Sequence, residues 1–155
     1  MSDINLADLC REASAALNQS NPDALAQGEM IEVDGVAVEL HQGEDMPVPV
    51  LIAEIGAVEA ADEVQVFRNV LRVQLMTAQA PLLRFGYHPV RETLVITQVL
   101  KFGTAATGEA LAQLIRATCR QAAEWRSSLL AGQVSDPFGL LHKDNAPTEA
   151  AGVRA

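Results

Sequence analysis

The strand-like run ETLVITQVLKF, at residues 92–102, is the feature that most constrains how this chain can fold. Side chains of a strand alternate between two faces. One face runs from Leu94 to Phe102 and is apolar except for Gln98, which suits a buried core. The other face alternates threonine and valine up to Lys101, so it is neither clearly polar nor clearly apolar. The strand therefore predicts a sheet with one buried face and leaves open what covers the second.

Three further strands and one short partner strand are expected before this run. The dipeptide Asp34-Gly35 supplies the two positive φ angles of a type I′ turn and predicts a hairpin between EMIEV and VAVELHQ. The next strand, VPVLIAEIG, begins with prolines 47 and 49, which cannot donate to a ladder, so its start is expected at an edge or a bulge. PLLRFGYH follows as the strand before the opening run. Tight turns join most of these strands, which predicts a largely antiparallel sheet.

Three helices are expected, at about residues 3–17, 60–78 and 107–130. Ser2 or Asp3 can cap the first, Thr107 can cap the third, and Gly132 suits the end of the third. A surface helix of a monomer usually carries one apolar stripe, but the middle helix carries two. It is therefore expected either to be central in its own domain or to touch another subunit. The two stripes are Val64, Phe67, Leu71, Leu75 and Val66, Val70, Val73, Met76.

The resulting order, α-β-β-β-α-β-β-α, predicts an α+β fold of two layers, with helices packed on a largely antiparallel sheet. A chain of 155 residues is expected to form one domain, which we assign to residues 1–131. Residues 132–155 lose all periodicity and are predicted to be a flexible tail, in which Phe138, Leu140 and Leu141 could dock.

The net charge of −9 argues against nucleic acid and anionic membranes as partners, because both repel a negative field. The N-terminus lacks the basic start and apolar run of a signal peptide, and no stretch reaches the ~20 apolar residues of a membrane helix. Cys10 and Cys119 each fall on the apolar stripe of a predicted helix. Buried free thiols in a reducing cytosol are expected, with a disulfide as the alternative.

Motifs for catalysis or cofactor binding are missing from the sequence. It has no glycine-rich phosphate loop, G-x-S-x-G, H-E-x-x-H or paired C-x-x-C. His41, His88 and His142 are spread over a strand, a turn and the tail, so no metal site is expected. Glu54 is either a functional acid or a strand-end residue at the solvent rim. We therefore expect neither an enzyme nor a cofactor, and the surplus apolar surface points to protein contacts.

The element order, VPVLIAEIG leading into a long helix, and LLRFGYHPVRETLVITQVL followed by a helix with AAEW resemble the class I type III secretion chaperones, the Tir chaperone family. The resemblance covers residues 3–131. It implies a cytoplasmic bacterial homodimer that binds the N-terminal region of a secreted effector in extended form. The chaperone would keep that effector soluble and secretion-competent, with the ATPase of the export apparatus as a further candidate partner. The resemblance implies a role in virulence but no enzymatic activity.

Carried over by element, the resemblance assigns the dimer contact to Val66, Val70 and Val73. Two other functions stay open: a regulatory or adaptor module of the same fold that binds a folded protein, and a small-molecule or catalytic protein with an unseen site. In either protein-binding case, the threonine and valine face of residues 93–99 would be covered by a twin subunit or a client. The effector-binding residues implied are Leu9, Ala13, Leu17, Met30, Val33, Val38, Val95 and Val99.

Overall fold

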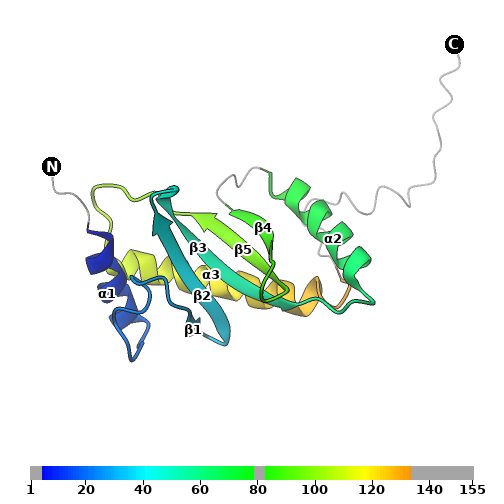
Figure 1. The fold of residues 1–155 in the computed structure, drawn as a ribbon, viewed down its shortest axis with the longest axis horizontal. Helices are drawn as coiled ribbons and strands as arrows, with labels where there is room; N and C mark the ends of the chain where they lie inside the picture. Colours follow the sequence, from blue (N-terminus) through cyan, green and yellow to red (C-terminus); the bar gives the residue numbers. More distant parts are fainter. Residues whose placement is uncertain (1–4, 79–82, 134–155) are drawn as a thin grey trace, which may run out of the picture.

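A computed structural model describes residues 5–78 and 83–133 of the chain, and it has the predicted α+β architecture (Figure 1). The segment 134–155, with Phe138, Leu140 and Leu141, lies outside the described residues, so the tail stays a prediction. The elements follow one another in the predicted order. They are α1 (Leu6–Ala16), β1 (Ile31–Val33), β2 (Val36–Gly43), β3 (Met46–Ala57), α2 (Glu63–Met76), β4 (Leu83–His88), β5 (Thr93–Val99) and α3 (Gly108–Ser128).

The five strands form one sheet in the order β1-β2-β3-β5-β4, and every neighbouring pair is antiparallel. Asp34 and Gly35 have φ angles of 51° and 78°, which confirms the predicted hairpin turn. The register of β2 against β3 shifts between His41 and Gly43. There the side chain of Gln42 donates to the carbonyl oxygen of Pro47. The irregularity predicted from the prolines at the start of β3 is therefore confirmed.

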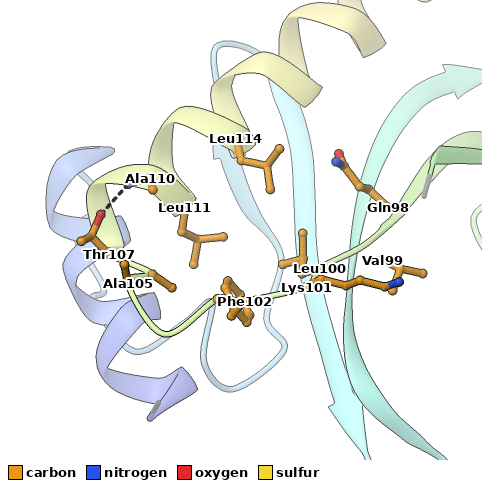
Figure 2. A pocket seen from close by; sticks show the side chains of 12 residues that line it. Gln98, Val99, Leu100, Lys101, Phe102, Ala105, Thr107, Ala110, Leu111 and Leu114 are labelled. Atoms are coloured by element: carbon orange, nitrogen blue, oxygen red, sulfur yellow. Dashed lines mark hydrogen bonds between the residues drawn. The ribbon is translucent and has the colours of Figure 1, made fainter. Parts of the chain in front are cut away.

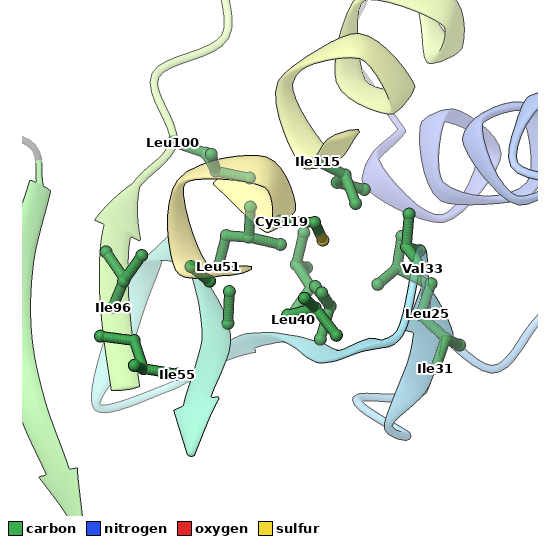
Figure 3. Packing of buried hydrophobic residues seen from close by; sticks show 14 of the residues in the cluster. Leu25, Ile31, Val33, Leu40, Leu51, Ile55, Ile96, Leu100, Ile115 and Cys119 are labelled. Carbon is green, nitrogen blue, oxygen red and sulfur yellow. The ribbon is translucent and has the colours of Figure 1, made fainter. Parts of the chain in front are cut away.

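The helices lie on one side of the sheet: α3 packs across the strands, α1 packs on α3, and α2 contacts β4. Figure 1 shows α3 running behind the strands. The strands and α3 meet in a core whose largest members are completely buried, among them Leu51, Ile55, Ile96 and Ile115 (Figure 3). The buried side of α2, which lies beyond β4, joins the same core. No described helix covers the opposite face, which carries the threonines and valines of β5.

The first helix is fastened to the third at two points. The carboxylate of Glu12 accepts from the backbone N–H of Gly108, at the first turn of α3. Arg116 donates to the carbonyl oxygen of Ala16, at the end of α1. The N-cap of α1 is Asn5, whose side chain accepts from Ala7 N. The prediction that Ser2 or Asp3 caps this helix was therefore wrong, and the helix begins later in the chain.

A bulge in β3, between Glu54 and Gly56, bends the strand where α3 crosses it. The guanidinium of Arg126 donates to the carbonyl oxygens of Glu54, Ile55 and Gly35. A bulge releases carbonyls from the ladder, and buried carbonyls need a donor. Arg126 thus satisfies the groups that the bulge releases and ties α3 to the sheet.

Both cysteines are buried free thiols, as predicted. Burial raises the pKa of Cys10 to about 11. Burial, with a smaller contribution from Asp34, raises the pKa of Cys119 to about 12. Because the thiolate is the reactive form, neither side chain is a nucleophile near neutral pH.

Candidate protein-binding surfaces

An apolar groove lies between the end of β5 and the beginning of α3, and we call it the α3 groove. Its volume is about 490 Å³. Figure 2 shows Leu111, Leu114 and Phe102 turned toward a common space, while Val99 and Lys101 point away from it. The remaining lining residues are Gln98, Leu100, Gly103, Ala105, Ala106, Thr107 and Ala110.

The sequence leaves this groove open because small residues stand at its mouth. Ala105 and Ala110 are exposed, and neither side chain can reach across to close the space. Leu100 and Leu111 beneath them are buried at 3% and 2% exposure, so the floor is fixed by the core. Thr107 caps α3 by accepting from Ala110 N at 3.2 Å, as predicted, and thereby holds the rim. A preformed apolar groove with a rigid floor suits an apolar side chain of another molecule.

The second candidate surface is the sheet face opposite the helices, which we call the open sheet face. Its centre is apolar and half-buried, formed by Val50 and Ile52 of β3 and Val99 of β5. Met46 and Val48, at the start of β3, extend it with exposures of 43% and 44%. Antiparallel sheets often have one solvated face, but that face is then usually polar. Contiguous apolar surface of this kind marks a contact with another chain.

A charged group lies on the same face. Arg91, from the turn between β4 and β5, reaches across to Glu39 on β2 at 2.7 Å and to Glu54 on β3 at 3.2 Å. The other carboxylate oxygen of Glu39 lies 3.3 Å from His41 Nε2. Burial alone would raise the pKa of Glu39, but the hydrogen bonds from Arg91 and His41 outweigh burial and hold that pKa below its ordinary value.

The turn that positions Arg91 is built around His88. Its Nδ1 accepts from the backbone N–H groups of Val90 and Arg91, at 3.3 and 3.1 Å. His88 is thus the turn residue that the sequence indicates. Glu54 lies on the open sheet face and pairs with Arg91, and its side chain is 23% exposed. No three histidine, cysteine or acidic side chains among residues 5–78 and 83–133 gather in a way that could hold a metal ion.

The third candidate surface is the outer side of α2, the α2 ridge, formed by Val64, Leu71 and Leu75. Their exposures are 71%, 71% and 73%. Leu71 and Leu75 also line a hollow of about 460 Å³ beside Leu83 of β4. Large apolar side chains this exposed, aligned on one helix face, are unusual on a monomer.

The structure places the predicted dimer residues on the inner side of α2. Val66, Val70 and Val73 are 1%, 7% and 6% exposed and belong to the core of their own chain. Their assignment to a subunit contact stays a prediction, and their burial argues against it because they have little surface left to offer. Of the two apolar stripes in the sequence, the outer one forms the α2 ridge.

Most of the predicted effector-binding residues also face the core. Of the eight, Met30 is 54% exposed and Val99 is half-buried on the open sheet face. Val95 shares that face but is only 4% exposed. The binding role of the set stays a prediction, and only Met30 and Val99 present appreciable surface. The other five are buried between α1, α3 and the first hairpin: Leu9, Ala13, Leu17, Val33 and Val38.

Sequence reasoning missed Arg91 and the groove alanines. Arg91 pairs with carboxylates 37 and 52 residues away, and the short segment PVR gives no local signal of that. Ala105 and Ala110 leave the α3 groove open because their side chains are small. The sequence does not reveal this, because the groove depends on which residues pack around them. The alternation of β5 is the one signal that pointed to the open sheet face.

The sequence matches no protein-family model and no curated protein. The fold does have solved counterparts. A chain in the crystal structure of the ExsC–ExsE complex superimposes with a TM-score of 0.61 at 15% sequence identity, over 80% of this chain and 92% of that one. The likeness therefore establishes a shared fold.

None of the described helices is long and apolar enough to cross a membrane. Within residues 5–78 and 83–133, apolar side chains lie open on three surfaces: the α3 groove, the open sheet face and the α2 ridge. Each suits contact with another polypeptide.

Proposed function

We propose that this protein is a type III secretion chaperone that binds the N-terminal region of an effector in extended form and keeps it soluble and secretion-competent. Its role is binding and not catalysis. The proposal is supported by the fold shared with a chain of the ExsC–ExsE complex. It is supported equally by the resemblance of residues 3–131 to the Tir chaperone family.

The observation that carries the proposal is the α3 groove. Fixing an extended ligand costs ~1–2 kcal/mol for each backbone residue, and burying a leucine or isoleucine returns about 1.5–3 kcal/mol. A client must therefore place apolar side chains in preformed spaces at several points. The α3 groove offers one such space, with Leu111 as its floor and Leu114 as a wall.

A homodimer would carry two such grooves, and the α2 ridge is the surface that suits the contact between its chains. A twofold contact uses the same patch on both chains. Leu71 and Val64 are two helical turns apart, so they project in the same direction. In an antiparallel pair of α2 helices, Leu71 of each chain would meet Val64 of its twin.

Filling the groove tests the proposal. Ala110→Trp places an indole at the exposed mouth without touching the core. Ala123→Trp is the matched control, since Ala123 is exposed on the same helix outside the groove. Each variant is co-expressed with N-terminal segments of the secreted proteins of the same genome, and soluble complexes are captured.

We expect the wild type and Ala123→Trp to retain a client and Ala110→Trp to lose it. Limited proteolysis of the captured complex should show a protected client segment without a folded core. A protected folded domain would instead indicate the adaptor function. Capture of no segment by the wild-type protein, or equal capture by all three proteins, would contradict the proposal.

A further inference from the structure

The ion-paired group of Glu39, Glu54 and Arg91 on the open sheet face has more carboxylates than cations. Glu39 and Glu54 share one guanidinium, that of Arg91, so two carboxylates are paired with a single permanent cation. Both oxygens of Glu39 have partners. For Glu54, only Oε2 is engaged, and Oε1 accepts no hydrogen bond from the residues that the structure describes.

The surplus charge borders apolar surface. Side chains of one strand face repeat every second residue, so Glu54, Ile52 and Val50 project side by side from β3. Val99 is paired with Val50 across the ladder and extends the apolar surface onto β5. Any chain that covers Ile52 and Val50 also removes water from Glu54. A carboxylate that loses water needs a charged donor in exchange.

The face's other cations do not fill this need. By alternation, Arg84 on β4 and Lys101 after β5 belong to the same face. Neither forms an ion pair with a carboxylate among the described residues. Arg84 lies opposite Thr97 in the β4–β5 ladder. Strand β5 therefore separates Arg84 from Glu54 on β3.

We propose that the open sheet face binds a segment that carries a lysine or arginine between apolar residues, with the cation on Glu54 and the apolar side chains on Ile52 and Val50. The inference rests on the proposed binding of an extended client and adds a chemical requirement to it. The cation of the bound segment would form an ion pair with Glu54. The two carboxylates, Glu39 and Glu54, would then be matched by two cations, Arg91 and that of the segment. The apolar residues supply the buried area.

Short synthetic peptides test this requirement. One peptide alternates valine and threonine around a central lysine, and two others carry glutamine or glutamate in its place. Fluorescence anisotropy gives the affinity of each. We expect the lysine peptide to bind the wild-type protein about tenfold more tightly than the glutamine peptide, and the glutamate peptide to bind least.

Three variants distinguish a contact between the peptide lysine and Glu54 from a general attraction of the cationic peptide to the acidic protein. Glu54→Gln should abolish the preference for lysine, and Glu54→Lys should reverse it in favour of glutamate. Glu124→Gln removes the same charge from an exposed site on α3 and should keep the preference. Thermal unfolding checks that each variant is folded.

Equal affinity for the three peptides, no binding of any, or a lysine preference that survives Glu54→Gln would overturn the inference. The proposed chaperone function fails separately. It is lost if the wild type captures no client, whereas a client that is captured but shows no dependence on Glu54 contradicts only the inference drawn here.

Discussion

Single side chains hold this fold together at places where the backbone departs from regular geometry. Arg126 is the clearest case, because its guanidinium donates to the carbonyl oxygens of Glu54 and Ile55 at the β3 bulge and of Gly35 in the β1–β2 turn. Hydrogen bonds from charged donors are stronger than neutral ones, and an unsatisfied buried carbonyl is costly. The side chain therefore contributes to stability.

Arg126→Ala should lower the free energy of unfolding by roughly 2–3 kcal/mol, because the carbonyls of Glu54 and Ile55 lose their donor. The free energy of unfolding of Arg126→Lys should lie between those of the wild type and Arg126→Ala, since an ammonium cannot reach three acceptors at once. Arg120→Ala, at an exposed position of the same helix, should be nearly neutral. Urea unfolding measures all three, and an Arg126→Ala protein as stable as the Arg120→Ala control would disprove the role.

Glu39 should make stability depend on pH in the acid range. Its pKa in the folded protein lies below the ordinary value of 4.5, so its contribution is present above about pH 4.5 and is lost as the pH falls through the folded pKa. Glu39→Gln should therefore flatten the decline of unfolding free energy toward low pH. Urea midpoints measured across the acid range test this, with Glu44→Gln as an exposed control. A decline as steep in Glu39→Gln as in the wild type would show that Glu39 does not drive it.

At the level of elements, α1 and α3 cross unusually closely. A Cβ atom added at Gly108 would lie 2.1 Å from Glu12 Cβ and 2.9 Å from Ala13 N. Backbone cannot yield as a flexible side chain can. The crossing thus depends on the absence of a side chain at this one position.

Gly108→Ala should destabilise the protein by about 1–3 kcal/mol, even though alanine is the better helix former. Gly103→Ala is the control, because no atom lies within 4 Å of its added Cβ. Thermal unfolding of both variants decides the matter. If Gly108→Ala were as stable as Gly103→Ala, α1 would have to be able to move away from α3 at no cost.

The elements also show what the sequence could and could not reveal. Periodicity predicted every helix and strand in order, because 3.6-residue and two-residue repeats are local properties. The two stripes of α2 were both visible, but which one faces the core depends on how α2 meets β4, and that is a tertiary contact. The open sheet face was visible in β5 alone, whereas its charges come from Glu39, Glu54 and Arg91 on separate segments.

For the whole molecule, the three apolar surfaces of the described residues support the proposal that the chain works in contact with other chains. The α2 ridge exposes more than two thirds of each of its three apolar side chains. In water such a patch favours self-association through the hydrophobic effect. The proposed homodimer gives this patch a specific occupant.

Leu71→Glu should convert the protein from a species of twice 16.5 kDa to one of 16.5 kDa, because it puts two charges into an apolar twofold contact. Val90→Glu is the control, since Val90 is 84% exposed on the β4–β5 turn. Sedimentation equilibrium measures the mass. A wild-type protein that sediments as a single chain at all concentrations would exclude the dimer.

The α3 groove and the open sheet face meet at residues 99–101, since Val99 and Lys101 border both. A long ligand seated in one is therefore tethered at high local concentration beside the other. Affinity should then exceed what either half achieves alone, in the manner of a bivalent ligand. A client cut into two peptides where it crosses residues 99–101 should therefore bind much more weakly than the intact client, although each peptide keeps its own contacts.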